Sequence, residues 1–381
     1  MAKARQAKEI MLVVGEASGD NHGAHLVKAL QRRDPRLRVY GVGGEQLRQT
    51  SFEVIFSVAK LTGMGVVELA GNLRNLWNAY RLLRRTLQER RPDLLVLIDF
   101  PEFNLRLAKL AKSLQIPVLY YVSPQIWAWR RGRVRQIARW VDQMAVVFPF
   151  EVAFYKEHGV KVTFVGHPLL ESVHVKEGRD TVLTKLGLNP GKPTVALLPG
   201  SRHREVSYHL PVMVEAAMRL RRERDVQFLL VRASTVDAGE IASILAQGKP
   251  QIPVIEQGRY DAVSASDLVW TASGTATLEA ALLQKPMIVV YRLSWLTYCL
   301  ARLLVKVDHI GMVNLIAGER VVPELVQSDF TADRLVEETR TLLDNPLIRS
   351  QLIDKLSTLR GELGFSGAAD RVADLALAMM G

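Results

Sequence analysis

Short apolar runs alternate along the chain with longer amphipathic segments. In the first half these runs are IMLVVG, RVYGVG, LLVLID, VLYYV, MAVVF and VTFVG. They are continuously apolar, which is typical of strands buried on both faces and therefore of a parallel sheet with helices on each side. The segments between them, such as residues 73–90 and 104–113, have the spacing of amphipathic helices. The pattern predicts an α/β fold.

The same rhythm restarts after VGHPLLESVHVKEGRD, which has no clear period and resembles a linker. The runs TVALLPG, VQFLLV, LVWTAS and PMIVVYR follow it, again separated by helical patterns. Two such halves predict two doubly wound, Rossmann-like domains facing an interdomain cleft, at residues 1–168 and 169–349. The pattern leaves open whether the C-terminal helix, about residues 350–381, packs back on the first domain.

The charge of the chain points to an anionic partner. The net charge is +11, which favours nucleic acid, anionic lipid or a phosphorylated substrate, unless the charge only solubilises the surface. Five arginines lie in RRGRVRQIAR, but no zinc-finger spacing or aromatic RNA-binding signature accompanies them, so we expect no nucleic acid.

Several features indicate a cytoplasmic protein. Cys299 is the only cysteine, which excludes disulfides within the chain and fits a reducing compartment. The N-terminal residues lack the apolar core of a signal peptide. No apolar run reaches the roughly 18 residues that a membrane-spanning helix needs.

Two turns of the second half predict an anion site. In LLPGSRHREV, Ser201 and Arg202 lie at a helix start, where backbone N–H groups and a guanidinium favour phosphate. In TASGTATLEAALLQKP, the turn Ser273–Gly274–Thr275 opens a helix that could hold a pyrophosphate, and Glu279 could accept hydrogen bonds from ribose hydroxyls. The alternative is that both turns are ordinary helix caps followed by solvated side chains.

The first half carries carboxylates where strands end. Asp99 ends a buried strand in VLIDFPEFN, followed by Glu102 and Asn104, and could accept a proton from a substrate hydroxyl or cap the next helix. In VVGEASGD, Glu16 and Asp20 are poor neighbours for a phosphate but could bind sugar hydroxyls or orient a neighbouring base.

Aromatic and basic residues suggest contact with an amphiphile. Trp127 and Trp129 in YYVSPQIWAWRRGR flank such a ligand or fill the domain surface. The segments VVELAGNLRNLWNAYRLLRRTLQER and LSWLTYCLARLLVKV are basic and amphipathic, as in helices at a lipid interface, although most amphipathic helices face a core. No metal-binding motif, G-x-S-x-G elbow or Walker A loop is present, so we expect no metal and no cofactor.

Six segments together resemble one family. GEASGD, IDFPEFN, SPQIWAWR, LPGSRHREV, SGTATLEAAL and VNLIAGERVVPELVQ, in this order from residue 15 to about 327, are similar to lipid-A-disaccharide synthases. These are bacterial glycosyltransferases with two Rossmann-like domains, the GT-B fold. The resemblance implies transfer of 2,3-diacylglucosamine from UDP to the 6-hydroxyl of 2,3-diacylglucosamine 1-phosphate (lipid X), with inversion to a β-1,6-linked disaccharide phosphate.

The resemblance also implies roles for particular residues. It places Arg202, Glu279 and Asn314 in the donor or catalytic site and favours Asp99 as the base, with Glu16 on the acceptor side. Arg202 and the helix start at residues 274–275 would stabilise the departing UDP without a metal. It implies a peripheral protein on the cytoplasmic face of the inner membrane, in contact with its lipids, and leaves a homodimer open.

Other interpretations make different predictions. Another GT-B enzyme would act on UDP-N-acetylglucosamine, as a lipid-linked transferase or an epimerase. An NAD-dependent oxidoreductase would have G-x-G-x-x-G after the first strand, where this chain has GEASGD. A non-catalytic membrane-binding protein would tolerate replacement of Asp99.

Overall fold

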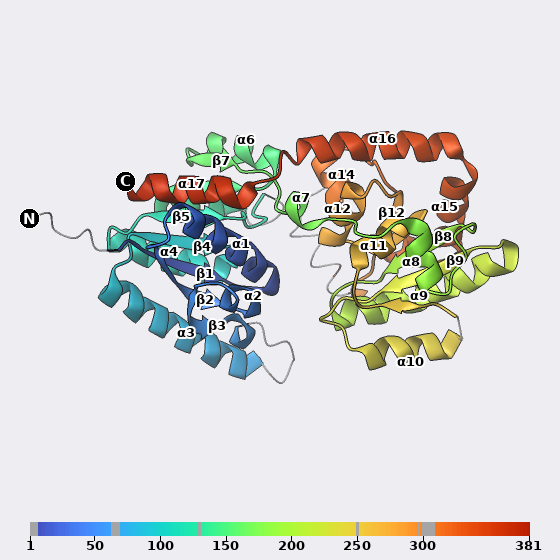
Figure 1. The fold of residues 1–381 in the computed structure, drawn as a ribbon, viewed down its shortest axis with the longest axis horizontal. Helices are drawn as coiled ribbons and strands as arrows, with labels where there is room; N and C mark the ends of the chain where they lie inside the picture. Colours follow the sequence, from blue (N-terminus) through green and yellow to red (C-terminus); the bar gives the residue numbers. More distant parts are fainter. Residues whose placement is uncertain (1–6, 62–68, 128–130, 249–250, 296–297, 299–308) are drawn as a thin grey trace, which may run out of the picture. The chain divides into compact units, whose positions relative to one another are not determined.

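The structure is a computed structural model that describes residues 7–61, 69–127, 131–248, 251–295, 298 and 309–381 (Figure 1). The chain divides into two compact units. Unit 1 contains Met1–Pro168 and Leu363–Gly381, and unit 2 contains Leu169–Glu362. Cys299, Trp129, Arg130 and most of LSWLTYCLARLLVKV lie outside the described residues.

Unit 1 is built on a seven-stranded parallel sheet in the order β3-β2-β1-β4-β5-β6-β7. The strands are β1 (Glu9–Val14), β2 (Arg38–Gly43), β3 (Glu53–Ser57), β4 (Leu94–Ile98), β5 (Val118–Tyr121), β6 (Gln143–Val146) and β7 (Val162–Phe164). Every residue of β4 and β5 is buried, because helices cover both faces of the sheet. The predicted α/β fold with buried parallel strands is therefore confirmed for this unit.

The helices of unit 1 form two layers (Figure 1). They are α1 (Ala17–Arg33), α2 (Glu45–Arg48), η1 (Val58–Lys60), α3 (Leu69–Arg90), α4 (Pro101–Ser113), η2 (Arg131–Arg133), α5 (Val134–Trp140), α6 (Pro149–Glu157) and α17 (Ala368–Met380). Helices α3, α4 and α5 pack side by side in that order, whereas α1 packs against α2 and α17.

Unit 2 repeats the architecture with a six-stranded parallel sheet in the order β10-β9-β8-β11-β12-β13. Its strands are β8 (Thr194–Leu198), β9 (Gln227–Val231), β10 (Val254–Ile255), β11 (Leu268–Ala272), β12 (Met287–Tyr291) and β13 (Glu324–Val326). Its helices are α7 (Leu169–Ser172), α8 (Arg179–Lys185), α9 (His203–Glu223), α10 (Ala238–Gly248), α11 (Arg259–Ala265), α12 (Thr275–Leu282), α14 (Met312–Ala317), η3 (Gln327–Asp329), α15 (Ala332–Asp344) and α16 (Pro346–Glu362).

The C-terminal region contributes to both units. Helix α16 packs in unit 2, where Lys355 pairs with Glu319 at 2.7 Å. Helix α17 packs on α1 of unit 1, where Arg33 pairs with Asp370 at 2.7 Å and with Asp374 at 2.6 Å. The buried residues of α17 are small, namely Ala368, Ala369, Val372, Ala373 and Ala376, which allows the helix to lie close to its neighbours.

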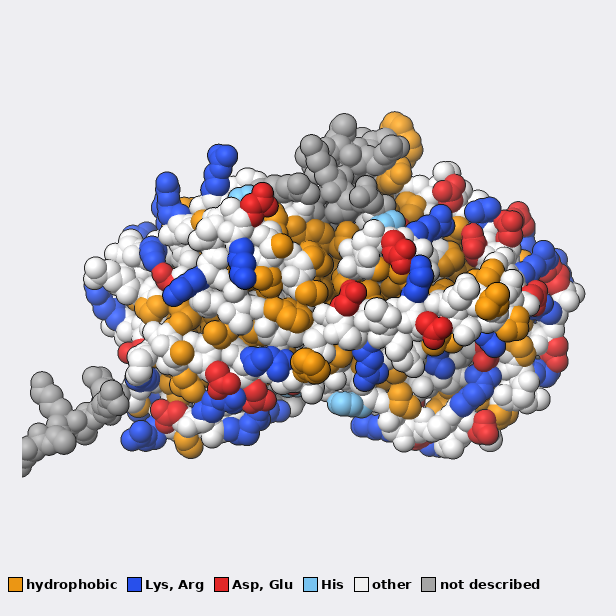
Figure 2. Space-filling view, turned by 90° about the horizontal axis from the view of Figure 1, so that it is seen from above, with side chains coloured by type: hydrophobic (Ala, Val, Ile, Leu, Met, Phe, Trp, Pro, Cys, Tyr) orange, Lys and Arg blue, Asp and Glu red, His pale blue; other side chains and the backbone are white. Residues whose placement is uncertain are grey.

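Charged side chains of both signs share the surface of the molecule. On the face drawn in Figure 2, Lys and Arg side chains are interspersed with Asp and Glu rather than gathered into one basic patch.

Within the ranges that the structure describes, no helix combines the length and the apolar character needed to cross a bilayer.

The close packing of α17 can be tested by adding volume. Replacement of Ala373, which is fully buried, by leucine is expected to lower the free energy of unfolding by about 1–3 kcal/mol through overpacking. The same change at the exposed Ala378 of α17 is the control and should have little effect. Urea unfolding measures both variants. Equal stability of the two variants would contradict tight docking of this helix.

Candidate active site

Both sheets reverse their strand order at one point, and the predicted site residues follow the strands on either side of it. In unit 1 the chain builds outwards from β1 and then returns to pair β4 beside it. In unit 2 the same reversal lies between β8 and β11. Parallel α/β sheets bind ligands outside the carboxyl ends of the strands at such a switch point. Glu16 and Asp99 flank the switch point of unit 1, and the two anion-seeking turns flank that of unit 2.

Asp99 lies in a strained turn directly after β4. Both Asp99 and Phe100 have positive φ angles, 49° and 50°, which non-glycine residues rarely adopt. Two buried side chains hold the turn. Asn104 Nδ2 donates to the carbonyl oxygens of Ile98 (3.2 Å) and Asp99 (2.7 Å), and the Tyr120 hydroxyl donates to the Asp99 carbonyl at 2.5 Å. The surrounding structure therefore fixes the position from which the Asp99 carboxylate projects.

The GEASGD turn packs against this Asp99 turn. A Cβ atom at Gly15 would lie 2.1 Å from Cβ of Phe100, so only glycine allows the contact. Glu16 is the N-cap residue of α1, and its side chain is exposed. Its negative charge acts on Asp99. The structure thus brings together Glu16 and Asp99.

The environment of Asp99 suits proton transfer. Burial, together with the negative charges of Glu16 and Glu102, raises the pKa of its carboxyl from 3.8 to about 6, against a hydrogen bond from the Phe100 backbone. A carboxylate with this pKa is ionised at neutral pH and is a stronger base than an ordinary aspartate.

Asp20 does not belong to this site, and the prediction that it binds sugar hydroxyls or orients a base is wrong. The residue lies one turn inside α1 and is buried, with its carboxylate directed at the β2–α2 turn. It accepts hydrogen bonds from the backbone N–H groups of Gly44 (2.6 Å), Gln46 (2.8 Å) and Leu47 (3.4 Å). Asp20 therefore caps α2 and is a structural residue.

His22 lies near the unit 1 switch point, and the sequence analysis missed it. Its ring lies 6.2 Å from that of Tyr121, which ends β5. Burial, together with the nearby His25, lowers the pKa of His22 to about 4, so the imidazole is neutral at pH 7. Its buried Nδ1 has no hydrogen-bond partner within the described part of the chain. The only sequence signal is a histidine two residues after GEASGD.

The environment of Trp127 favours the surface-filling alternative. Its indole Nε1 donates to Glu151 at 3.2 Å, and its ring meets that of Phe150 edge-on at 5.0 Å. The side chain is buried in unit 1. Trp127 thus fills a space in the domain. Trp129 lies outside the described residues.

In unit 2, the turn after β8 is closed by its own glutamate. Gly200 has a φ of 130°, and the Ser201 N–H donates to Glu205 Oε2 at 3.0 Å. Arg202 is only loosely paired with Glu205, at 3.4 Å, and 60% of its side chain is exposed. The Glu205 carboxylate occupies the kind of position that a phosphate oxygen would take at this helix start, while the Arg202 guanidinium remains accessible.

His209 connects this turn to the end of β12. It is fully buried, its Nδ1 donates to the Pro199 carbonyl at 2.8 Å, and its Nε2 accepts the Arg292 N–H at 2.9 Å. Burial lowers the pKa of His209, which keeps the ring neutral. The sequence analysis also missed this residue, since a histidine on an apolar helix face carries no distinctive signal.

The turn after β11 leaves a helix start uncapped. Gly274 is the N-cap residue of α12, with a φ of 138°, and as a glycine it offers no side-chain cap to the N–H groups of the helix start. Apart from its chain neighbours, no atom of the described residues would lie within 4 Å of a Cβ at Gly274, so these residues leave the space beside the turn open. Ser273 anchors the turn by donating to the Ile310 carbonyl at 2.7 Å.

Glu279 lies one turn inside α12 and is buried. Arg259 and the Tyr260 hydroxyl both donate to its Oε1. Burial raises the pKa of Glu279, whereas the positive charge of Arg259 opposes the rise. The second carboxylate oxygen, Oε2, is the atom that remains to accept hydrogen bonds from a ligand.

Asn314 is enclosed by its own chain. Its Nδ2 donates to the Val322 carbonyl (2.9 Å) and to Glu324 (2.8 Å), and its Oδ1 accepts the Val322 N–H at 2.8 Å. Glu324 also accepts the N–H groups of Ile310 and Gly311. The network therefore runs from Asn314 through Glu324 to residue 310, and from there to the Ser273 turn.

These features define the class of protein. Two parallel-sheet α/β units, each with polar turns at its switch point, form the GT-B architecture of nucleotide-sugar glycosyltransferases and epimerases, as predicted. The fold resembles UDP-GlcNAc 2-epimerase from Neisseria meningitidis bound to UDP-GlcNAc (TM-score 0.68, 12% identity, 97% and 100% of the two chains). It also resembles CalG4, the calicheamicin glycosyltransferase (TM-score 0.61, 15% identity, 98% of each chain). At these identities the likeness shows the fold alone.

Sequence similarity identifies the family. The model of the lipid-A-disaccharide synthetase family matches residues 10–366. The chain is 45% identical to the lipid-A-disaccharide synthase of Geobacter sulfurreducens, over 98% of this chain and 97% of the relative. It is 46% identical to that of Syntrophus aciditrophicus, over 98% of each chain. The chain belongs to the lipid-A-disaccharide synthetase family and is a glycosyltransferase of lipid A disaccharide synthesis.

The raised pKa of Asp99 predicts a stability change. Because the folded protein holds this proton up to about pH 6 and the unfolded chain only to about 3.8, ionised Asp99 destabilises the fold above pH 6, by up to about 3 kcal/mol. Asp99→Asn should therefore raise the free energy of unfolding at pH 8 and lose this advantage near pH 4. Urea unfolding at both pH values measures the effect, with the exposed Glu157→Gln as control. A variant less stable than the wild type at pH 8 would contradict this assignment.

Proposed function

We propose that unit 1 binds the acceptor and that Asp99 is the general base of an inverting transfer. The 6-hydroxyl oxygen of 2,3-diacylglucosamine 1-phosphate attacks C1 of the donor 2,3-diacylglucosamine unit, and the bond from C1 to the UDP phosphate oxygen breaks. The hydroxyl proton passes to Asp99. The products are the β-1,6-linked disaccharide 1-phosphate, UDP and protonated Asp99. The observation that carries this proposal is the partly buried Asp99 carboxylate at the switch point, with its pKa of about 6.

Unit 2 then binds the donor. The uncapped start of α12, with the turn Ser273–Gly274–Thr275, offers N–H groups and the positive end of the helix dipole to the pyrophosphate. The accessible guanidinium of Arg202, beside Ser201, compensates the negative charge that develops on the departing UDP. Glu279 Oε2 accepts hydrogen bonds from the ribose.

Two residues have indirect roles in this scheme. Asn314 positions the donor turn through Glu324 and residue 310, because its own amide is already hydrogen-bonded. Glu16 binds acceptor hydroxyls and, through its charge, keeps Asp99 basic. No metal ion is part of the scheme. Among the described residues, no three His, Cys, Asp or Glu side chains are grouped so that they could hold one.

The pH dependence of activity tests the roles of Asp99 and Glu16. With UDP-2,3-diacylglucosamine and the acceptor, kcat/KM should fall on the acidic side with an apparent pKa near 6. Glu16→Gln should move this limb to lower pH, because a negative neighbour of Asp99 is removed. Asp99→Asn should reduce kcat by about 10²–10⁴-fold.

The matched control is Glu45→Gln, which removes an exposed carboxylate of unit 1 and should leave the acidic limb in place. An Asp99→Asn variant that retains full turnover would exclude Asp99 as the base. A folded wild-type protein that forms no disaccharide would overturn the reaction itself.

We further propose that α3 places the enzyme on the cytoplasmic face of the inner membrane. Trp77 has 58% of its surface exposed and stacks on Tyr80 at 6.4 Å. Arg81 and Arg84 are exposed on the same helix, whereas Arg85 is engaged with Glu89 at 2.6 Å. Exposed aromatic and basic residues on one helix fit an anionic lipid interface.

Vesicle binding tests this placement. Combined replacement of Trp77, Arg81 and Arg84 by alanine should weaken binding to anionic phospholipid vesicles by about tenfold or more, since each arginine near the surface contributes about 1 kcal/mol. Binding to zwitterionic vesicles should change less. The control removes two exposed arginines of unit 2, Arg222 and Arg320. Undiminished binding of the α3 variant would exclude this helix as the contact.

A further inference from the structure

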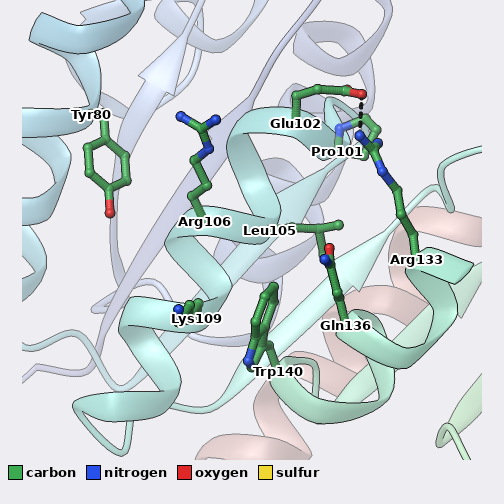
Figure 3. Close-up of a pocket in the computed structure, with 9 residues that line it drawn as sticks. All are labelled: Tyr80, Pro101, Glu102, Leu105, Arg106, Lys109, Arg133, Gln136 and Trp140. Atoms are coloured by element: carbon green, nitrogen blue, oxygen red, sulfur yellow. Dashed lines mark ion pairs between the residues drawn. The ribbon is translucent and has the colours of Figure 1, made fainter.

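A pocket on the outer helical layer of unit 1 has no role in the scheme above. It has a volume of about 430 Å³ and lies among α3, α4, α5 and the short helix η2 (Figure 3). Its polar lining comes mainly from α4, which begins two residues after Asp99. The pocket therefore lies on the same helix as the proposed catalytic turn, along the side of that helix.

The pocket carries an excess of positive charge. Arg106, Lys109 and Arg133 line it together with a single carboxylate, Glu102. Glu102 pairs with Arg133 at 2.7 Å, whereas Arg106 and Lys109 have no acidic partner in the described part of the chain. Figure 3 shows both side chains on α4, between Tyr80 on one side and Trp140 and Arg133 on the other. A recess that contains two unpaired cations favours the binding of a dianion.

The walls of the pocket are partly apolar. Tyr80, Leu105 and Trp140 contribute to the lining, and the Lys109 ammonium lies 5.8 Å from the Trp140 ring centre. A recess with apolar walls and two cations suits the phosphate end of an amphiphile better than a free inorganic anion.

An aromatic run leads from this pocket to the catalytic turn. Tyr80 stacks on the exposed Trp77 and meets Phe103 edge-on at 6.3 Å. Phe103 in turn stacks on Phe100 at 5.6 Å, and Phe100 packs over Gly15. Adjacent aromatic side chains of one unit thus connect the pocket to the Asp99 turn.

We propose that this pocket binds the phosphate of the acylated sugar acceptor through Arg106 and Lys109, while Trp77 and Tyr80, at the accessible end of the aromatic run, contact its acyl chains. The inference rests on the function proposed above and adds to it the group that recognises the acceptor phosphate. A phosphate monoester carries close to two negative charges at neutral pH, which matches the two unpaired cations. The connection to the Asp99 turn favours the acceptor over a bulk phospholipid, whose headgroup need not lie near the reacting hydroxyl.

The test compares two double variants of equal charge. Arg106→Ala with Lys109→Ala removes the two unpaired cations of the pocket. Arg135→Ala with Arg139→Ala removes two exposed arginines of α5 that do not line it. In neutral-detergent micelles, the pocket variant should raise KM for the acceptor by about 10–100-fold, as expected for loss of charge-assisted hydrogen bonds. Its kcat and its KM for the UDP-linked donor should stay within about twofold of wild type. The control should match wild type throughout.

A second acceptor identifies what the pocket recognises. With 2,3-diacylglucosamine that lacks the phosphate, wild type and pocket variant should have the same kcat/KM, because the lost contact is then absent from both. An equal penalty with both acceptors would overturn the proposal. An unchanged acceptor KM together with weaker binding to anionic vesicles would also overturn it, and would make the pocket a phospholipid site.

Direct binding separates this inference from the proposed reaction. Titration of the phosphorylated acceptor into wild type and pocket variant in the same micelles needs no turnover. Weaker binding to the variant alone supports the pocket even if the wild type forms no disaccharide, whereas equal binding overturns the pocket even if it does.

Discussion

The reversal of strand order in each sheet is the constraint on which the candidate site depends. Between β1 and β4, and again between β8 and β11, adjacent strands lead into helices that depart in different directions. A crevice between such helices is the usual ligand site of parallel α/β sheets, and the turns of the candidate site lie at these two places. Asp99 and Glu16 occupy one switch point, and the turns at residues 200–202 and 273–275 occupy the other.

The two switch points carry different chemical groups. In unit 1 the turn is strained at Asp99 and Phe100, and buried Asn104 and Tyr120 hold it in place. Burial then raises the pKa of Asp99, which suits this carboxylate to the role of the proposed base. In unit 2 the start of α12 offers backbone N–H groups and the turn after β8 an accessible arginine, the groups that we propose bind the UDP part of the donor. Transfer of a sugar from a nucleotide requires a base for the acceptor hydroxyl and anion-binding groups for the departing nucleotide.

The residues near the sites show where sequence reasoning succeeds and where it stops. Continuous apolar runs predict the strands because burial on both faces leaves no polar alternation, and the parallel sheets confirm this. The prediction that Asp20 binds sugar hydroxyls or orients a base is wrong, because its partners are the N–H groups of Gly44, Gln46 and Leu47, more than twenty residues away. His209 carries no distinctive sequence signal and His22 only its position two residues after GEASGD, and it is packing against distant strands that gives both a place beside a site.

The sequence by itself determines the alternation of strands and helices, the glycines of the turns at residues 15, 200 and 274, and the polar residues that follow these strands, since these depend on local propensity and periodicity. Only the tertiary structure decides which carboxylate has a raised pKa and which caps a helix. The pKa of Asp99 depends on burial and on the charge of Glu16, 83 positions earlier, and the capping role of Asp20 depends on where β2 ends. Likewise, the unpaired charge at Arg106 and Lys109 becomes apparent only when α3, α4 and α5 are packed together, because pairing and desolvation are properties of neighbours in space.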